Sequence, residues 1–181
     1  MGGEGPVEQE YISRTKLDEN ASLYAESTAG QVRVRADYLV FLTGKERVAV
    51  DLRSLDEISE VGGGIGLPQT HPSVLGLISL RGETVLLFDL PSLTGSSATS
   101  ELQSHHRVLV FADDTGQRWA FLVERVDGVV SLETGGFQLA QDRDRDVDIR
   151  SELISAIAEH DDRSLALLNI DALVELAREC L

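Results

Sequence analysis

From Tyr38 onward the chain consists of short apolar runs that glycine and charged residues interrupt about every 8 to 12 residues. This spacing is typical of an all-β sandwich or barrel. Glycine occurs in the predicted turns, for example at Gly44, Gly82 and Gly116, where the backbone needs a positive φ. The predicted strands are Tyr38–Thr43, Arg47–Leu52, Val74–Leu80, Thr84–Leu90, Arg107–Ala112, Arg118–Glu124, Val126–Leu132, Glu152–Ala158 and Ser164–Leu168.

The two ends of the chain have different patterns. Residues 1–36 contain few apolar residues without a sustained period, and we expect a disordered acidic tail there; a short peptide that docks on a partner is the alternative. Residues 37–181 form the predicted domain. Near its end we expect one short helix, because an apolar stripe at helical spacing follows a potential N-cap, Asp171. The stripe consists of Leu173, Val174, Leu176 and Ala177.

The domain contains an internal repeat, whose copies cover roughly residues 38–95 and 106–176. The matching segments are Leu39-Val40-Phe41 with Leu109-Val110-Phe111, Arg47 and Ala49 with Arg118 and Ala120, Leu77-Ile78-Ser79 with Leu153-Ile154-Ser155, and Val85–Leu90 with Leu165–Ile170. Each copy has about 60 residues, which is marginal for an independent fold. We therefore predict two small β-barrels that are pressed together.

Composition and charge exclude several classes of protein. The 181 residues carry 31 acidic and 16 basic side chains, a formal net charge of −15, which repels nucleic-acid backbones and anionic membranes. The longest apolar runs have about five residues, too few for a membrane helix or the core of a signal peptide. The single cysteine, Cys180, cannot form an internal disulfide, which fits the cytoplasm. We expect no nucleic-acid partner and no direct insertion into a membrane.

The residue types that carry catalysis form no recognisable site. The run Gly62–Gly66 lacks both phosphate-binding fingerprints, and no predicted helix follows it. His71, His105, His106 and His160 lack the spacing of a zinc site. A G-x-S-x-G nucleophile motif is absent from the sequence. We therefore predict that the protein is not an enzyme and uses no cofactor and no metal.

Two charged residues stand in apolar surroundings. The predicted strand Val74–Leu80 runs directly into Arg81, and Gly82 after it can adopt the left-handed conformation of a turn. Upstream, Glu57 lies within the partly apolar segment Leu55–Ile58. A charge in such a setting needs a partner, and arginine offers a planar, two-pronged donor. We predict an ion pair between Glu57 and Arg81; the alternative is two independent exposed charges.

The order of these segments resembles the CheW family of bacterial chemotaxis adaptors, over Tyr38 to Leu176. The matching segments are the V-x-E-I-like Leu55–Ile58, the G-x-I-N-L-R-G signature at Gly76–Gly82, the D-L-x-x-L-x-G segment at Asp89–Gly95, the G-x-L-V-D-x-V segment at Ala120–Val126 and the L-L-D-x-x-x-L segment at Leu167–Leu173. The departures from the family's residues are Ser79, Ala120, Glu124 and Asn169.

The resemblance implies a fold and a function. The fold is all-β, with two SH3-like five-stranded β-barrels that share an apolar core and with a short C-terminal helix. The implied function is non-catalytic: the protein bridges the cytoplasmic tip of methyl-accepting chemoreceptors and the regulatory domain of a CheA-type histidine kinase. It implies a cytoplasmic location, at receptor arrays on the inner face of the membrane. The implied partner-binding residues are Glu57, Arg81 and Gly82, with Leu55, Ile58, Leu77 and Leu80 as candidates for lining or supporting the receptor groove; a core role is the alternative for these four.

Two other functions stay open on the sequence. One is a CheW-like binding module outside arrays, which sequesters a kinase or serves pili or another output. The other is a small-molecule sensor that uses the groove between the barrels. Deletion of residues 1–36 followed by a binding test separates the first from an array adaptor, because only the module outside arrays needs the tail for its main contact. A ligand that raises the melting temperature would indicate the second.

Overall fold

The described part of the chain begins just before the first strand. The computed structural model describes residues 34–67, 71–96, 99, 102–138 and 148–181, and Arg35–Leu181 form one compact unit. Strand β1 (Arg35–Thr43) begins at Arg35, which pairs with Glu133. Arg35 and Ala36 therefore belong to the domain, so the sequence places the end of the tail too late. The prediction of disorder otherwise falls on residues 1–33, outside the described residues.

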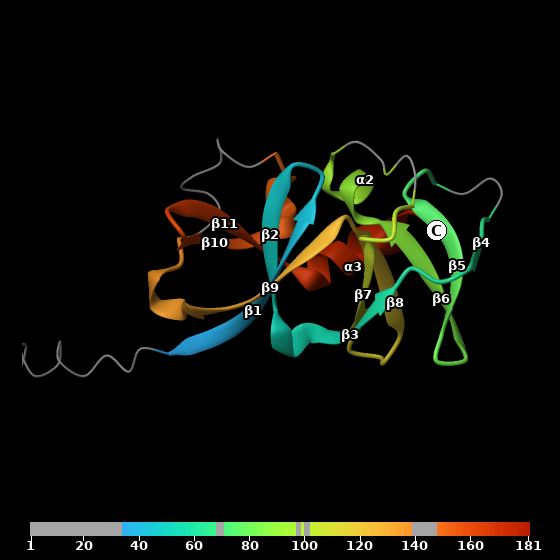
Figure 1. The fold of residues 1–181 in the computed structure, drawn as a ribbon, viewed down its shortest axis with the longest axis horizontal. Coiled ribbons are helices and arrows are strands. Elements are labelled where there is room, and N and C mark those ends of the chain that lie inside the picture. The colour runs from blue at the N-terminus through green and yellow to red at the C-terminus, as the bar shows by residue number, and fades with distance from the viewer. Residues whose placement is uncertain (1–33, 68–70, 97–98, 100–101, 139–147) are drawn as a thin grey trace, which may run out of the picture. The chain divides into compact units, whose positions relative to one another are not determined.

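Within the described residues the strands form two sheets, which we call sheet A and sheet B (Figure 1). Sheet A has the order β10-β11-β2-β1-β9, and sheet B has the order β3-β7-β8-β6-β5-β4. Sheet A contains β1, β2 (Glu46–Asp51), β9 (Arg125–Glu133), β10 (Ile154–His160) and β11 (Arg163–Leu168). Sheet B contains β3 (Leu55–Glu60), β4 (Gly64–Ile65), β5 (Val74–Leu80), β6 (Glu83–Asp89), β7 (Arg107–Ala112) and β8 (Arg118–Val123). Short 3-10 helices are η1 (Leu52–Ser54), η2 (Thr134–Gly136) and η4 (Ser151–Leu153).

The two copies of the repeat exchange strands. In sheet A, β1 and β2 of the first copy lie between β9 and β11 of the second copy. In sheet B, β7 and β8 of the second copy lie between β3 and β6 of the first. The parallel pairings are equivalent as well: Ala49 of β2 pairs with Leu167 of β11, and Ala120 of β8 pairs with Leu87 of β6. The two halves are thus related by a pseudo-twofold arrangement, and each sheet needs both copies.

The strand register corrects one part of the repeat. Leu80 pairs with Glu83 and His160 pairs with Arg163, so two equivalent hairpins end in two-residue turns. Counted back from these turns, Leu77 corresponds to Ile157. The sequence alignment of Leu77 with Leu153 is therefore wrong, because apolar triplets of similar composition match at more than one register.

Each sheet curls into a barrel around its own core, and a larger core lies between the barrels. Barrel A, formed by sheet A, encloses Tyr38, Val40, Ala49, Leu132, Ala158, Leu165 and Leu167. Barrel B, formed by sheet B, encloses Ile78, Leu80, Val85, Leu87, Val108, Val110, Ala120 and Leu122. The shared core includes Leu39, Phe41, Phe88, Leu109, Phe111, Trp119 and Phe121. This is the architecture that the sequence predicts, with one difference: sheet B carries the short β4 as a sixth strand.

The central strands bury both of their faces. Along β1, Tyr38 and Val40 face the interior of barrel A, whereas Leu39 and Phe41 face the shared core. A strand that is buried on both faces needs an apolar residue at nearly every position. The uninterrupted apolar runs in β1, β7 and β8 therefore follow from the position of these strands between two cores.

Besides β4 and the short 3-10 helices, two elements lie outside the sequence prediction. Strand β3 alternates half-buried and exposed positions, but half of its residues are acidic, and this hides the strand pattern. Helix α2 (Leu90–Thr94) begins after Asp89, whose carboxylate accepts a hydrogen bond from the backbone N–H of Ser92, and it ends at Gly95 with a φ of 99°. The sequence predicts Leu90 as the end of a strand, because a single helical turn is too short to show a helical period.

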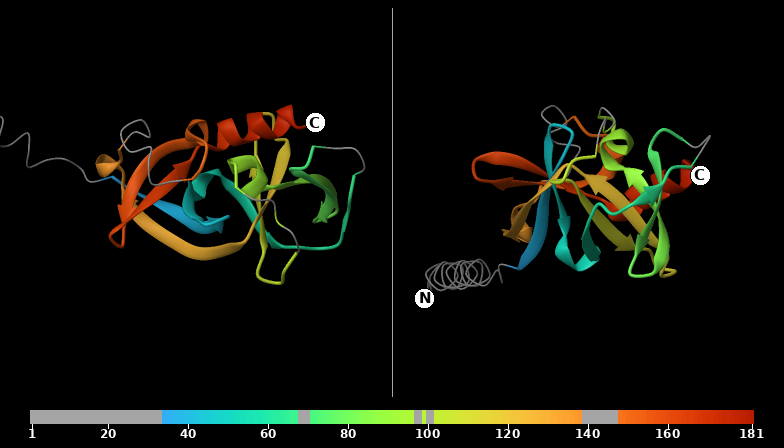
Figure 2. Two further views of the ribbon diagram at one scale, coloured as in Figure 1. Left: turned by 90° about the horizontal axis from the view of Figure 1, so that it is seen from above. Right: turned by 45° about the vertical axis from the view of Figure 1, so that its right-hand side comes forward.

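Helix α3 (Ile170–Glu179) lies against the junction of the two sheets (Figure 2) and buries Leu173, Val174 and Ala177, as its apolar stripe predicts. Its N-cap is Asn169, whose Oδ1 accepts a hydrogen bond from the N–H of Ala172 at 3.2 Å. The prediction of Asp171 as the cap is wrong, and Asp171 lies in the first turn. In the described ranges, no helix has the length and apolar character that a membrane crossing requires.

Asp113 attaches the end of α3 to the β7–β8 hairpin. Its carboxylate accepts hydrogen bonds from the hydroxyl and N–H of Thr115, from the N–H of Gln117 and, at 3.1 Å, from Nε1 of Trp119. Arg178 of α3 pairs with the same carboxylate, and its guanidinium lies 5.3 Å from the centroid of the Trp119 ring. The hydrogen bonds, that of the Thr115 hydroxyl first, hold the pKa of Asp113 well below its usual range.

We expect the ionised Asp113 to stabilise the domain at neutral pH and to lose this effect in acid. Because its folded-state pKa is depressed, the contribution is complete above the ordinary carboxyl pKa of about 3.9 and disappears as the pH falls through the folded value. In thermal melts, Asp113→Asn should melt below the wild type at about pH 6, and the gap should narrow below about pH 4. Asp114→Asn, which changes an exposed carboxylate of the same hairpin, is the control. A gap that is independent of pH would contradict this assignment.

Candidate functional site

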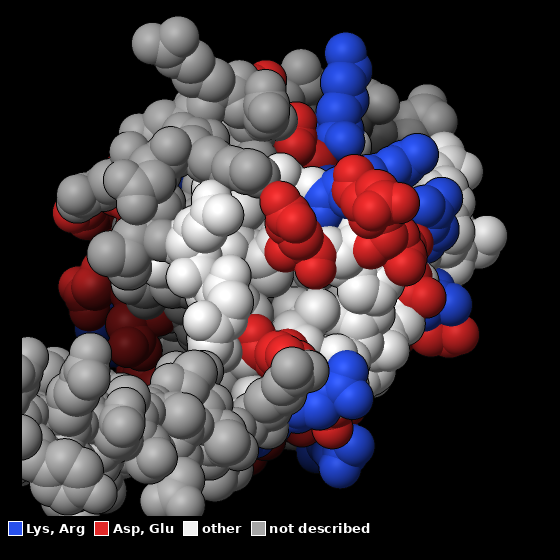
Figure 3. Space-filling model, turned by 90° about the vertical axis from the view of Figure 1, so that its left-hand side faces the viewer, with Lys and Arg blue, Asp and Glu red and all other residues white. Residues whose placement is uncertain are grey.

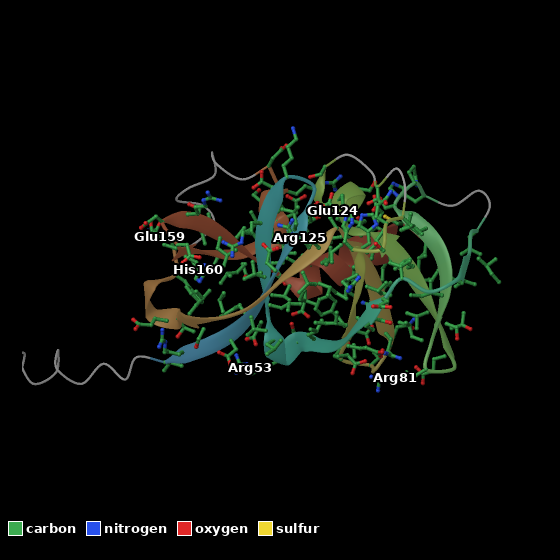
Figure 4. All side chains as sticks on the ribbon, in the orientation of Figure 1. Arg53, Arg81, Glu124, Arg125, Glu159 and His160 are labelled. Carbon is green, nitrogen blue, oxygen red and sulfur yellow. The ribbon has the colours of Figure 1, made fainter. Side chains whose placement is uncertain are left out.

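Arg81 is presented at the tip of the β5–β6 hairpin (Figure 4). Leu80 pairs with Glu83, which leaves a two-residue turn. Arg81 has a φ of 50° and Gly82 a φ of 86°, and positive φ at both central residues is what a type I′ turn requires. Gly82 therefore adopts the left-handed conformation that the sequence predicts. The side chain of Arg81 is 78% exposed.

Glu57 of β3 binds two arginines at once. Its Oε1 accepts a hydrogen bond from Nε of Arg81 at 3.1 Å, and its Oε2 accepts one from Nη2 of Arg118 at 2.6 Å. The side chain of Glu57 is only 12% exposed, and a register shift between Leu55 and Glu57 sets its position in the strand. Hydrogen bonds from Arg118 first, and then from Arg81, lower the pKa of Glu57. The pair predicted from sequence is thus present, as part of a larger cluster.

Arg118 lies at the centre of this cluster. Its side chain is 17% exposed, and it lies 2.6 Å from Glu57, 3.0 Å from Asp56 and 3.2 Å from Glu83. Since β8 lies between β7 and β6 in sheet B, Arg118 reaches β3 on one side and β6 on the other. We call Asp56, Glu57, Arg81, Glu83 and Arg118 the barrel B charge cluster.

The apolar candidates from the sequence are divided among different environments. Leu80 is 5% exposed and belongs to the interior of barrel B, and Leu55 packs against the shared core. These two therefore have the core role that was the alternative to lining a groove. Leu77 is half-buried and lines an apolar cavity, and Ile58 is 43% exposed. The structure does not bring the four side chains together in one groove.

The sequence does not predict Arg118, Asp56 and Glu83 as members of the site. One signal was available, because Arg118 matches Arg47 in the repeat. Nothing in the local sequence, however, says which carboxylates an arginine at the start of a strand meets across two neighbouring strands. Only the sheet order decides this.

Barrel A carries a reduced counterpart of the cluster. Arg47, which corresponds to Arg118, lies 3.3 Å from Asp127, which corresponds to Asp56. Gly128 stands where barrel B has Glu57, and the equivalent hairpin tip is Asp161-Asp162, with φ values of 54° and 58°. The pseudo-twofold arrangement thus keeps the arginine–aspartate pair in both barrels, whereas the double arginine pairing through Glu57 exists in barrel B.

The described surface of each barrel includes a cavity. A cavity of about 420 Å³ in barrel A is lined by residues of β1, β9, η2 and β10, among them Leu132, Phe137 and Ile157. Figure 3 shows the face at this end of the molecule, where acidic side chains lie among basic and uncharged ones. A cavity of about 240 Å³ in barrel B is lined by β4, β5 and neighbouring apolar residues. Neither lies between the barrels, and among the described residues no group of three His, Cys, Asp or Glu side chains is placed to hold a metal ion.

The comparisons with known proteins agree with this fold. The structure is similar to the crystal structure of the scaffolding protein TtCheW from Thermoanaerobacter tengcongensis, with a TM-score of 0.68 at 19% sequence identity, over 80% of this chain and 90% of that chain. The search of the curated proteins returned no match. The family described as the CheW-like domain matches residues 37–178. The chain therefore belongs to the CheW-like domain family.

Proposed function

We propose that this chain is a non-catalytic adaptor that couples methyl-accepting chemoreceptors to a CheA-type histidine kinase in chemotaxis. Membership of the CheW-like family supports the adaptor role in general. The observation that carries the specific proposal is the barrel B charge cluster, in which a nearly buried Glu57 holds the exposed Arg81 at a hairpin tip. We place the protein in the cytoplasm, at receptor arrays on the inner face of the membrane.

Such an adaptor acts through binding energy alone. We propose that the cytoplasmic tip of a receptor, a helical hairpin, contacts the surface around Arg81, Gly82 and Ile58, while another surface meets the regulatory domain of the kinase. The receptor state then changes kinase activity through a coupling free energy between the two contacts. Leu77 remains a candidate for the receptor contact because it is half-buried beside a cavity, whereas Leu55 and Leu80 would support that surface from the core.

We expect Arg81→Ala to weaken receptor binding by about 10- to 100-fold, because it removes a charge-assisted contact of roughly 1.5–3 kcal/mol. Titration calorimetry with the tip fragment of a chemoreceptor from the same genome measures this. The melting temperature should change little, because the Arg81 side chain is largely exposed.

Arg53→Ala is the matched control, since the Arg53 side chain is 83% exposed and pairs with Asp51. A parallel titration of the wild type with the kinase regulatory domain tests the second partner. Absence of saturable binding to either partner by the folded protein would reject the proposed coupling.

A further inference from the structure

We propose that Arg118 is the positioning residue of the partner surface: it fixes the carboxylate of Glu57, and Glu57 in turn orients the guanidinium of Arg81. The Arg81 side chain is too exposed to be held by packing, at 78%, whereas those of Glu57 and Arg118 are only 12% and 17% exposed. Order at the hairpin tip therefore depends on the two inner residues. The consequence of this order for receptor binding rests on the function proposed above.

The hydrogen-bond distances indicate that Glu57 is bound more strongly by Arg118 than by Arg81. Nη2 of Arg118 lies 2.6 Å from Oε2, while Nε of Arg81 lies 3.1 Å from Oε1. Charge-assisted hydrogen bonds are stronger when they are short and shielded from water. Each oxygen of Glu57 accepts a hydrogen bond from one arginine. The bond to Arg118 therefore sets the orientation of the carboxylate to which Arg81 binds. Glu57 is thus anchored from the sheet side and offers its other oxygen to the tip.

Arg118 is itself held from two directions. Its Nε lies 3.0 Å from Oδ2 of Asp56 on β3, and its Nη1 donates a hydrogen bond of 3.2 Å to Oε2 of Glu83 on β6. The planar guanidinium has donors on three sides, which a lysine does not have. Hydrogen bonds to Glu57 and Glu83 hold this planar group, and Asp56 adds an ion pair in which Nε makes no hydrogen bond. These contacts explain the uncommon position of an acid on the inward side of β3.

The hydrogen bond of Arg81 to Glu57 uses Nε, so the N–H groups on its two terminal nitrogens stay available to a partner. An arginine held in this way presents a preorganised pair of donors, which binds a partner with less loss of side-chain entropy. In barrel A, Arg47 corresponds to Arg118. Arg47 forms an ion pair with Asp127, but Gly128 stands at the position of Glu57. Arg47 is therefore a control at the same structural position without the positioning role.

The test compares Arg118→Met with Arg47→Met by NMR, with the amide spectrum as the check of folding. The experiment has two readouts. One is the pH titration of the chemical shift of the Glu57 side-chain carboxyl carbon, and the other is the chemical shift of the Arg81 Nε–H signal. In Arg118→Met we expect the Glu57 titration to move toward higher pH and the Arg81 signal to move toward that of a free arginine. In Arg47→Met both should stay as in the wild type. Unchanged Glu57 and Arg81 signals in folded Arg118→Met would overturn the proposal.

Arg118→Lys keeps a cation at this position and serves if the methionine variant does not fold. We expect it to retain part of the low Glu57 titration but to lose the wild-type Arg81 signal, because an ammonium group cannot contact three carboxylates in the same plane. A wild-type Arg81 signal in this variant would equally overturn the positioning role.

Receptor binding separates this proposal from the proposed function. We expect Arg118→Met to weaken the binding of the receptor tip fragment at least tenfold, and to add nothing further when combined with Arg81→Ala. An additive loss in the double variant would overturn action through Arg81. If the NMR signals change as expected while all variants bind as the wild type does, the positioning role stands and the receptor surface lies elsewhere.

Discussion

Truncation of Phe121 to alanine is expected to destabilise the domain by about 3–5 kcal/mol, which is a large part of the roughly 5–15 kcal/mol that holds a domain folded. Phe121 is fully buried, with its ring centroid 5.7 Å from that of Phe88 and 5.9 Å from that of Phe111. These rings belong to strands of both repeat copies and form the centre of the shared core. The cavity therefore opens where the barrels meet, and chemical denaturation followed by tryptophan fluorescence measures its cost.

Phe137→Ala is the matched control for this prediction. Phe137 is half-buried beside barrel A and stacks edge-on against Tyr38 at 5.8 Å, outside the shared core. We expect it to cost clearly less than Phe121→Ala. Equal losses in the two variants would contradict the expectation that a cavity in the shared core costs more than one beside barrel A.

Glu57→Lys is expected to abolish the receptor coupling proposed above, with a loss of affinity on the order of 100-fold or more, because it breaks two charge-assisted bonds in one step. The substitution places a third cation beside Arg81 and Arg118 and leaves Arg118 to Asp56 and Glu83 alone. Like charges at this distance repel, so the hairpin tip should also lose its fixed arginine. Calorimetry with the receptor tip fragment measures the affinity, and a thermal melt reports the accompanying loss of stability.

Glu60→Lys provides the control for charge. Glu60 lies on the same strand, its side chain is 86% exposed, and it lies 3.9 Å from Arg107. It changes the net charge of the protein by the same amount as Glu57→Lys does. If both variants weaken binding equally, the effect is one of overall charge, and the specific role of Glu57 is rejected.

Much of the fold is readable from the sequence because its core strands carry an extreme pattern. The runs in β1, β7 and β8 are apolar at nearly every position, and the turns contain glycine or paired polar residues. Strand β3 is not predicted from the sequence, because the inward position of Glu57 breaks the alternation of apolar and polar residues that identifies a half-buried strand. Its carboxylate is tolerated there only because Arg118 and Arg81 meet it, and neither is near it in the sequence.

Some residues of the candidate site can also be predicted from the local sequence, whereas others depend on the order of the strands. Arg81 and Gly82 form a turn, and a turn can be predicted because the residues that favour it are adjacent in the sequence. The pairing of Glu57 with Arg81 follows from the expectation that a charge among apolar residues needs a partner. Arg118 joins them only through the order of strands in sheet B, which no local pattern contains.

By itself, the sequence determined an all-β chain with an internal repeat, a short C-terminal helix, an acidic surface and a charged pair in apolar surroundings. These features depend on side-chain periodicity and turn chemistry, which act over a few residues. The tertiary structure alone decided that the copies exchange strands, that Leu80 is interior while Ile58 is exposed, and that Arg118 links three carboxylates. Those features depend on which strands become neighbours, and that choice is made by burying both faces of the central strands at once.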